Sequence, residues 1–262
     1  MRILLLLILT TTVLQAIPYS GNIAAYWSLN QTTGSTMSDS TGLNNGTLYN
    51  MTSPSGGWVT SGVNNALQFD GSNDYAIVNH SGRLSYTSGD FSVGIWAKPE
   101  TVGIYTGLIS TDIASDQGWK IFMDAGYNHF RARYNSLVLD YPTILAGEWH
   151  HYGYVKSGTT LSIYMDGVFV ASNTCQATNP VTGSELVLGS YRINNARDGY
   201  YIYKGKMDEI AIWNRSLNGS EIQNVYLDGV TSVVATVPEP ASLVIMLLVI
   251  GIFLKIKFID YR

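Results

Sequence analysis

Short strand-like runs separated by turn residues dominate the chain between residues 23 and 213. In Phe91–Ala97, apolar side chains occupy alternate positions, which places them on one face of a strand. Asp166-Gly167 joins two such runs and can supply the positive φ angles of a two-residue hairpin turn. Evenly spaced strands with turn signals are typical of a sandwich or jelly roll. The other predicted strands are Ile23–Leu29, Ala66–Phe69, Tyr75–Val78, Trp119–Asp124, His129–Tyr134, Trp149–Val155, Thr160–Met165, Val168–Ala171, Glu185–Gly189 and Lys206–Trp213.

One helix is predicted, after the last strand. Asn218 can cap its first turn, and Glu221 three residues later completes a capping box. Leu217 precedes the cap and can pack against the helix as a hydrophobic staple. The apolar stripe of the helix is Ile222, Val225 and Tyr226. The sequence therefore predicts an all-β fold, a jelly-roll sandwich of two antiparallel sheets with one short C-terminal helix.

Both ends of the chain are apolar and resemble targeting segments rather than parts of the domain. Arg2, a leucine-rich run and a small residue at Ala16 predict a secretory signal peptide over residues 1–16. At the other end, residues 241–258 give 18 positions that can span a bilayer if Lys255 and Lys257 reach the headgroups. These lysines place the C-terminus in the cytoplasm. The remainder is one predicted domain, residues 17–230, and a linker, residues 231–236.

Charge and cysteine content narrow the function classes. The chain has 15 basic and 19 acidic residues, and the ends hold four and two of them, so the domain carries a net charge of about −6. Binding of nucleic acid requires a basic face, so we predict no nucleic-acid partner.

Cys175 is the only cysteine, which excludes an internal disulfide. It can pair between chains or have no role.

No catalytic pattern is evident. The alternating carboxylates of a jelly-roll glycoside hydrolase, Glu-x-Asp-x-x-Glu, occur nowhere. Asp208 and Glu209 are adjacent, so on a regular strand they are expected to point to opposite faces and not to act together. The same argument predicts structural roles for His150 and His151. We therefore expect a protein that is not an enzyme.

Six stretches resemble one family, and they stand in the family's order. They are Ala25–Leu29, Asp39–Leu48, Ala66–Tyr75, Phe91–Pro99, Glu148–Gly167 and Asp208–Ile222. Together they resemble the laminin-G-like, concanavalin-A-like jelly-roll domains of bacteria, over about residues 23–227. The resemblance implies a two-sheet jelly roll and often a structural calcium ion.

Carried over from that family, the calcium ligands would be Asp39, the carbonyl of Gly42 and Asp208. Calcium prefers carboxylates and backbone carbonyls in a flexible loop, and the loop at Asp39 offers both. Alternatively, Asp39 and Asp70 only shape turns by accepting hydrogen bonds from nearby amides.

Sugar binding would use exposed aromatic rings together with polar groups that fix orientation. The candidate ligand residues cluster in one stretch that also contains Asn195, Arg197 and Tyr203; they are Tyr191, Arg192, Asn194, Tyr200 and Tyr201. Tyr105, Trp119 and Tyr127 are further candidates. Alternatively, these tyrosines simply occupy half-exposed strands, where tyrosine is common.

Pro238-Glu239-Pro240 stands immediately before the apolar C-terminal run. Residues 237–262 resemble the PEP-CTERM sorting signal. The resemblance implies an exosortase-type enzyme that cleaves near these prolines, so that an inner-membrane-anchored chain is sorted to the cell surface or extracellular matrix. Alternatively, the tail is a permanent anchor.

The sequence thus predicts a non-catalytic, exported surface protein that binds carbohydrate or extracellular matrix polysaccharide. Two other functions stay open. One is a structural or adhesive protein that binds protein partners, and the other is an unrecognised glycoside hydrolase.

Overall fold

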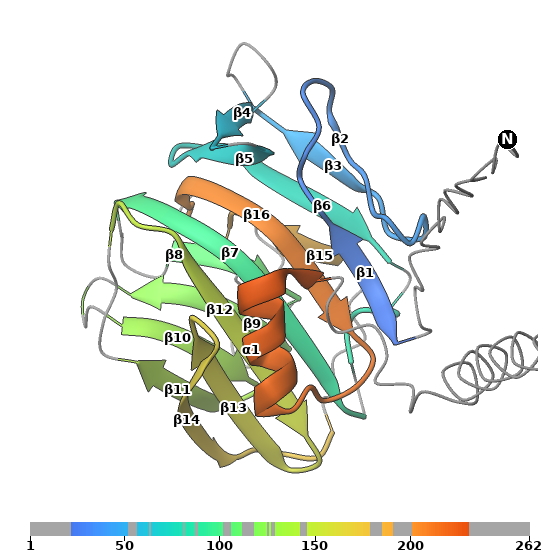
Figure 1. Ribbon diagram of the computed structural model, residues 1–262, viewed down its shortest axis with the longest axis vertical. Helices are drawn as coiled ribbons and strands as arrows, with labels where there is room; N and C mark the ends of the chain where they lie inside the picture. Colours follow the sequence, from blue (N-terminus) through green and yellow to red (C-terminus); the bar gives the residue numbers. More distant parts are fainter. Residues whose placement is uncertain are drawn as a thin grey trace, which may run out of the picture.

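The structure is a computed structural model. It describes residues 22–51, 57–62, 64–80, 82–86, 89–101, 106–111, 118–124, 126, 129–141, 146–178, 185–190 and 201–230. Within these ranges, the strands form two antiparallel sheets of eight strands each (Figure 1). The prediction of an all-β, two-sheet antiparallel sandwich is confirmed.

Sheet A has the spatial order β14, β13, β12, β7, β16, β5, β4, and β1 pairs with β16. Its strands are β14 (Val168–Thr174), β13 (Thr160–Met165), β12 (His150–Ser157), β7 (Phe91–Thr101), β16 (Lys204–Trp213), β5 (Asn64–Asp70), β4 (Trp58–Ser61) and β1 (Ile23–Trp27). The last strand within the described residues, β16, therefore lies in the middle of this sheet.

Sheet B has the spatial order β11, β10, β9, β8, β15, β6, β3, β2. Its strands are β11 (Leu137–Tyr141), β10 (His129–Tyr134), β9 (Trp119–Asp124), β8 (Thr106–Ser110), β15 (Glu185–Leu188), β6 (Tyr75–Asn79), β3 (Gly46–Tyr49) and β2 (Thr36–Met37). The inner faces of the two sheets enclose one apolar core.

Aromatic rings dominate the core. Phe91 stacks on Tyr86 with ring centroids 4.4 Å apart and packs against Trp119 and Tyr154 at 5.5 and 5.4 Å. Ring pairs of this kind stabilise a core beyond the area that they bury. Cys175 is a free, buried thiol at the edge of this core. Its burial favours the interpretation that it has no pairing role between chains.

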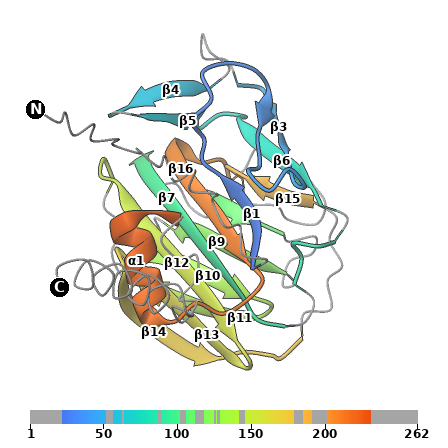
Figure 2. The ribbon, with the colours of Figure 1, turned by 45° about the vertical axis from the view of Figure 1, so that its right-hand side comes forward.

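The predicted helix is present as α1 (Gly219–Asp228), and it lies across the outer face of sheet A (Figure 1 and Figure 2). Ile222 and Val225 are buried against Trp213 and Leu217 in a second apolar cluster. Tyr226 extends the contact by stacking on Trp96, with ring centroids 5.5 Å apart.

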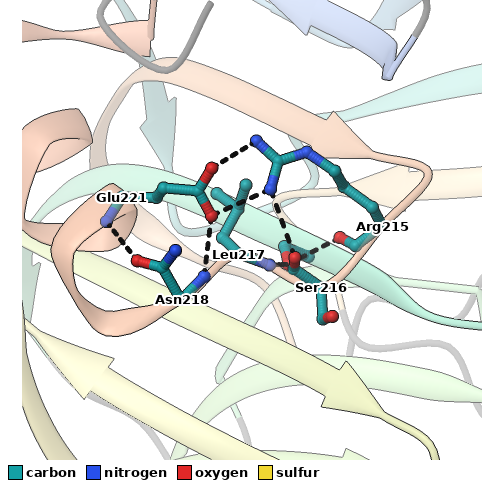
Figure 3. A network of polar contacts seen from close by, with 6 residues as sticks. Arg215, Ser216, Leu217, Asn218 and Glu221 are labelled. Carbon is teal, nitrogen blue, oxygen red and sulfur yellow. Dashed lines mark hydrogen bonds and ion pairs between the residues drawn. The ribbon is translucent and has the colours of Figure 1, made fainter. Parts of the chain in front are cut away.

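The capping box is confirmed and is part of a larger polar network (Figure 3). The Asn218 side chain accepts from the Glu221 N–H at 3.0 Å, and Glu221 accepts from the Asn218 N–H at 2.9 Å. Arg215 donates to both oxygens of Glu221, at 2.8 and 2.6 Å. The Ser92 hydroxyl on β7 accepts from the Leu217 N–H at 2.8 Å. The network therefore ties the start of α1 to the sheet below it.

Replacing Glu221 by alanine should lower the free energy of unfolding by about 2 kcal/mol, because both the cap and the bidentate ion pair are lost. Glu221→Gln should lose about half as much, since its amide oxygen can still accept from the Asn218 N–H. Urea denaturation of both variants measures these values. Equal losses in the two variants would show that the ion pair to Arg215 carries the whole effect.

Candidate functional site

Charged side chains occupy the outer face of sheet B where β9 ends and β10 begins. Met123 pairs with Phe130, and both side chains belong to the core. Because side chains alternate along a strand, the neighbouring pair of Asp124 and His129 faces outward. Arg131 faces outward by the same alternation.

These outward residues form what we call the Asp124 cluster: Asp124, His129, Arg131 and Asp140. The Arg131 guanidinium lies 2.7 Å from an Asp124 oxygen and 2.5 Å from an Asp140 oxygen. The His129 ring lies 3.7 Å from the same Asp140 oxygen. The Asp124 side chain is 1% exposed and that of Asp140 is 40% exposed. The guanidinium is thus held between one buried carboxylate and one accessible carboxylate, in a rigid array of donors and acceptors.

An aromatic pair lies on the same face of sheet B. Tyr49 on β3 faces Tyr75 on β6, and their rings stack with centroids 5.0 Å apart and planes at 10°. Tyr49 is one of the few large exposed apolar residues among those that the structure describes. Exposed tyrosines supply both an apolar ring and a polar tip to a ligand.

The aromatic pair and the Asp124 cluster lie at the same end of the sheet. Leu188 at the end of β15 pairs with Ala76 beside Tyr75. The next residue, Gly189, donates to the carbonyl of Leu108 near the start of β8. The start of β8 pairs with the end of β9, where Asp124 lies. Three strand spacings separate β9 from β6, or about 14 Å.

Tyr201, a predicted ligand residue, lies at this end as well. It is half-buried, and its carbonyl accepts from the N–H of Gly107 on β8 at 3.2 Å. Ser190 and Ile202 form a bridge that brings together the two ends of segment 191–200. The other predicted ligand residues lie outside the described residues; they are Tyr191, Arg192, Asn194, Asn195, Arg197 and Tyr200, together with Tyr105 and Tyr127.

Two of the aromatic residues predicted as candidates for sugar binding are buried, so these predictions are wrong. Trp119 is fully buried in the core, and its indole N–H donates to the carbonyl of Leu84 at 3.2 Å. Tyr203 is also fully buried, with its hydroxyl donating to the carbonyl of Lys206 at 3.0 Å and its ring against Phe69. Both side chains point inward, so neither ring can stack on a bound sugar.

The carboxylate of Asp39 organises the loop that follows β2. It accepts hydrogen bonds from the backbone N–H groups of Tyr26 at 2.8 Å, Thr41 at 3.0 Å and Asn44 at 2.9 Å. The Thr41 hydroxyl and the Asn44 side-chain amide donate to it as well. Gly42, at φ 75°, donates its N–H to the Asp39 carbonyl. Asp39 therefore shapes a turn, as does Asp70, which accepts from the N–H of Ser72.

The third predicted calcium ligand, Asp208, lies at an irregular point of β16. Asp208 faces Trp96 on β7, whereas Ala211 faces Gly94, so two residues of β16 lie opposite one residue of β7. Glu209 has a φ of 47° at this point. The arrangement is a β-bulge, which inserts one residue into the alternation of the strand.

The bulge overturns the expectation that Asp208 and Glu209 point to opposite faces. Met207 before them and Ile210 after them both lie in the core, so the two carboxylates between them face outward together. The Tyr26 hydroxyl donates to Glu209 at 2.5 Å.

Burial and the charge of Glu209 raise the pKa of Asp208 to about 7. Burial also raises the pKa of Glu209, against the hydrogen bond from Tyr26 that lowers it. Each acid is therefore harder to ionise in the folded protein than in water.

Tyr26 connects the predicted calcium ligands, because its N–H donates to Asp39 and its hydroxyl to the neighbour of Asp208. Within the described residues, no three His, Cys, Asp or Glu side chains are grouped as a metal site would require. Calcium binding by Asp39, Gly42 and Asp208 stays a prediction.

The two adjacent histidines have separate surroundings. His150 Nδ1 lies 2.7 Å from a carboxylate oxygen of Asp166 in the hairpin turn. His151 is fully buried, with Trp96 and Tyr226 beside its ring, and burial lowers its pKa to about 4. As expected for adjacent residues of a regular strand, they do not share a site.

The predicted targeting segments lie outside the described residues. They include the signal peptide, residues 1–16, and the sorting signal with Pro238, Glu239 and Pro240. Among the described ranges, which omit both ends of the chain, no helix is long and apolar enough to cross a membrane. Export, exosortase sorting and anchoring stay predictions.

Solved structures with a similar fold include domains attached to larger glycan-acting proteins. Domain 4 of the extracellular arabinanase AbnA from Geobacillus stearothermophilus, solved with arabinotriose, has a TM-score of 0.59 and 21% identity over 78% of this chain and 98% of that one. A Trypanosoma rangeli sialidase mutant with trans-sialidase activity has a TM-score of 0.63 and 16% identity over 81% of this chain. This chain spans only 34% of that sialidase.

The binding domain of Paraclostridial Mosquitocidal Protein 1 has a TM-score of 0.58 and 17% identity, over 79% of this chain and 52% of that one. At these identities the likeness concerns the fold alone. Among curated proteins, none matches this chain significantly. Residues 70–223, more than half of the chain, match the profile of the concanavalin A-like lectin/glucanases superfamily, Laminin_G_3. With two facing antiparallel sheets and this match, the chain belongs to the concanavalin A-like lectin/glucanase superfamily.

Proposed function

We propose that this protein is a non-catalytic glycan-binding domain whose ligand lies along one end of the outer face of sheet B. The observation that carries the proposal is the placement of the Asp124 cluster and the Tyr49–Tyr75 pair on that end. Support comes from the superfamily and from the arabinanase domain that was solved with arabinotriose.

The chemistry of this end suits a sugar. Arg131 holds the accessible carboxylate of Asp140, so this carboxylate can accept from a sugar hydroxyl group without being reoriented first. The Tyr49–Tyr75 stack offers an apolar ring on which the C–H face of a sugar can pack. Tyr201, one of the predicted ligand residues, lies at the same end of the sheet.

The Asp124 cluster also favours a ligand class. It holds two carboxylates for one guanidinium, so the cluster itself has no excess positive charge that would attract an acidic chain. We therefore propose that the ligand is a neutral oligosaccharide or polysaccharide.

Arg131→Ala and Tyr49→Ala should each weaken binding of a neutral oligosaccharide about tenfold or more, because the first releases the carboxylate of Asp140 and the second removes a ring that a bound sugar would contact. Arabinotriose and a glycan array are the probes, with calorimetry on any glycan that binds. The oligosaccharide should be recovered uncleaved, as expected for a protein that is not an enzyme.

Phe169→Ala is the matched control, because Phe169 is an exposed aromatic residue on sheet A. It should leave the affinity unchanged. Binding that survives both sheet B substitutions would contradict the placement of the site. Protein ligands without any glycan ligand would favour the adhesive alternative.

A further inference from the structure

Three exposed apolar residues lie near the point where the chain leaves α1, with Phe169 on the face of sheet A that α1 covers and Val168 on the other face of its strand. Val168 is 65% exposed, Phe169 54% and Leu227 64%. Among the described residues, the other exposed large apolar side chains are Leu43 and Tyr49. We call Val168, Phe169 and Leu227 the apolar corner. Single exposed apolar residues are ordinary, but a group of them on a soluble surface indicates a contact.

The packing of the Asp166-Gly167 turn on α1 brings together the two segments that carry these residues. A Cβ built on Gly167 would lie 3.2 Å from the Cα of Gln223 and 3.2 Å from the Cβ of Tyr226. Val168 follows Gly167, and Leu227 follows Tyr226 one helical turn after Gln223. Figure 1 shows the turn between β13 and β14 beside α1.

The apolar corner is held rigidly. The Phe169 ring packs edge-on against the Tyr164 ring, with centroids 5.7 Å apart and planes at 78°. Tyr164 itself packs on the cluster beneath α1. The edge strand β14 contains no charged residue over Val168–Thr174, so it can approach an apolar phase without burying a charge.

The chain that follows α1 is short. The helix ends at Asp228, and Val230 is buried against the domain. Only residues 231–240 separate it from the apolar segment at 241–258. Ten extended residues span at most about 35 Å. If the apolar segment lies in a bilayer, the apolar corner stays close to that bilayer, and tethering raises its effective concentration there.

We propose that the apolar corner docks on the lipid bilayer that holds residues 241–258. The domain then rests on the membrane through α1 and β14. The outer face of sheet B, on the opposite side of the sandwich from α1, points away from the lipid with its glycan-binding end accessible. The proposal rests on the predicted transmembrane segment and is independent of glycan binding.

The charges near the apolar corner indicate which lipid suits it. Asp166 in the adjacent turn and Asp228 at the end of α1 are acidic, and β14 offers no lysine or arginine. Anionic headgroups would be repelled by these carboxylates. Zwitterionic phosphatidylcholine is therefore the appropriate bilayer.

The test uses the full chain in phosphatidylcholine vesicles with an environment-sensitive fluorophore on a single introduced cysteine. Burial raises the pKa of the Cys175 thiol, so this native cysteine should react slowly with the label. The unsubstituted chain, which contains only Cys175, is therefore the control for background labelling. After flotation, labels at Phe169→Cys and Leu227→Cys should brighten several-fold and be quenched by spin-labelled lipid. A label at Tyr49→Cys, on sheet B, should do neither.

Each other outcome overturns the proposal. If the chain does not float with the vesicles, it is neither anchored in the bilayer nor docked on it. A chain that floats with equal quenching at positions 169 and 49 has no preferred orientation. Energy transfer between labels at position 169 on different molecules would assign the corner to a second copy of the chain. Glycan affinity measured on the Phe169→Cys and Leu227→Cys preparations reports separately on sheet B.

Discussion

Asp39→Ala is expected to lower the free energy of unfolding by about 4 kcal/mol. The backbone N–H groups of Tyr26, Thr41 and Asn44 all donate to this nearly buried carboxylate. An alanine leaves them without an acceptor, and each buried unsatisfied donor costs about 1–3 kcal/mol. The three losses are not additive, because the loop can relax. Urea denaturation at neutral pH measures the change.

Asp70→Ala is the control for this prediction, because Asp70 also shapes a turn but is exposed. It should cost less than about 1 kcal/mol, since water replaces the lost acceptor. Melting with calcium and with a chelator tests the calcium prediction separately. A chelator-induced fall in Tm that Asp39→Ala abolishes would support a metal, whereas a small loss in Asp39→Ala would contradict the role in the loop.

Asp208 should contribute a fall of about 2 kcal/mol to the stability of the protein between pH 4 and pH 7, opposed over much of this window by His151, whose pKa falls from 6.5 to about 4 on folding. The pKa of Asp208 rises from 3.8 to about 7 on folding, so the folded state keeps a proton that the unfolded chain releases in this window. The contribution of Asp208 to stability therefore decreases as pH rises through this window. The full shift corresponds to about 4 kcal/mol, and solvent at this partly exposed group reduces the effect by about half.

Asp208→Asn should remove the Asp208 part of this dependence and raise the free energy of unfolding by about 1–2 kcal/mol at pH 8, since no charge is then confined beside Glu209. Unfolding curves of the variant and the unsubstituted chain at pH 4, 6 and 8 give the comparison. The ion pair with Arg215 lowers the pKa of Glu221, so the stability that Glu221 contributes is lost as pH falls at more acidic pH. Both proteins contain Glu221, so it does not change the difference between their curves. Parallel curves would show that Asp208 does not titrate in this window.

Much of the fold could be predicted from local patterns in the sequence. The alternation in Phe91–Ala97, the Asp166-Gly167 turn and the capping box at Asn218 each depend on a few neighbouring residues. Five strands were beyond such patterns: β2, β3, β4, β8 and β11. They are short, are broken by glycine or lie at sheet edges, so distant partners stabilise them.

The candidate site depended more on pairing between strands. Arg131 lies between Asp124 and Asp140 only because β10 pairs with β9 and β11 in one particular register. Residue type alone does not predict whether Trp119 points into the core or outward to a ligand. The bulge at Glu209 arises where β16 pairs with β1 on one side and β7 on the other, which no local signal announces.

The central position of β16 determines when this domain can fold. Its partners β1, β5 and β7 are all made earlier, and sheet A has a gap in its middle until residues 204–213 emerge. Because these pairings join segments distant in sequence, folding should be slow and should begin only when nearly the whole domain has been synthesised. Until then the chain stays open, which is the form in which a polypeptide can be threaded through a translocation channel.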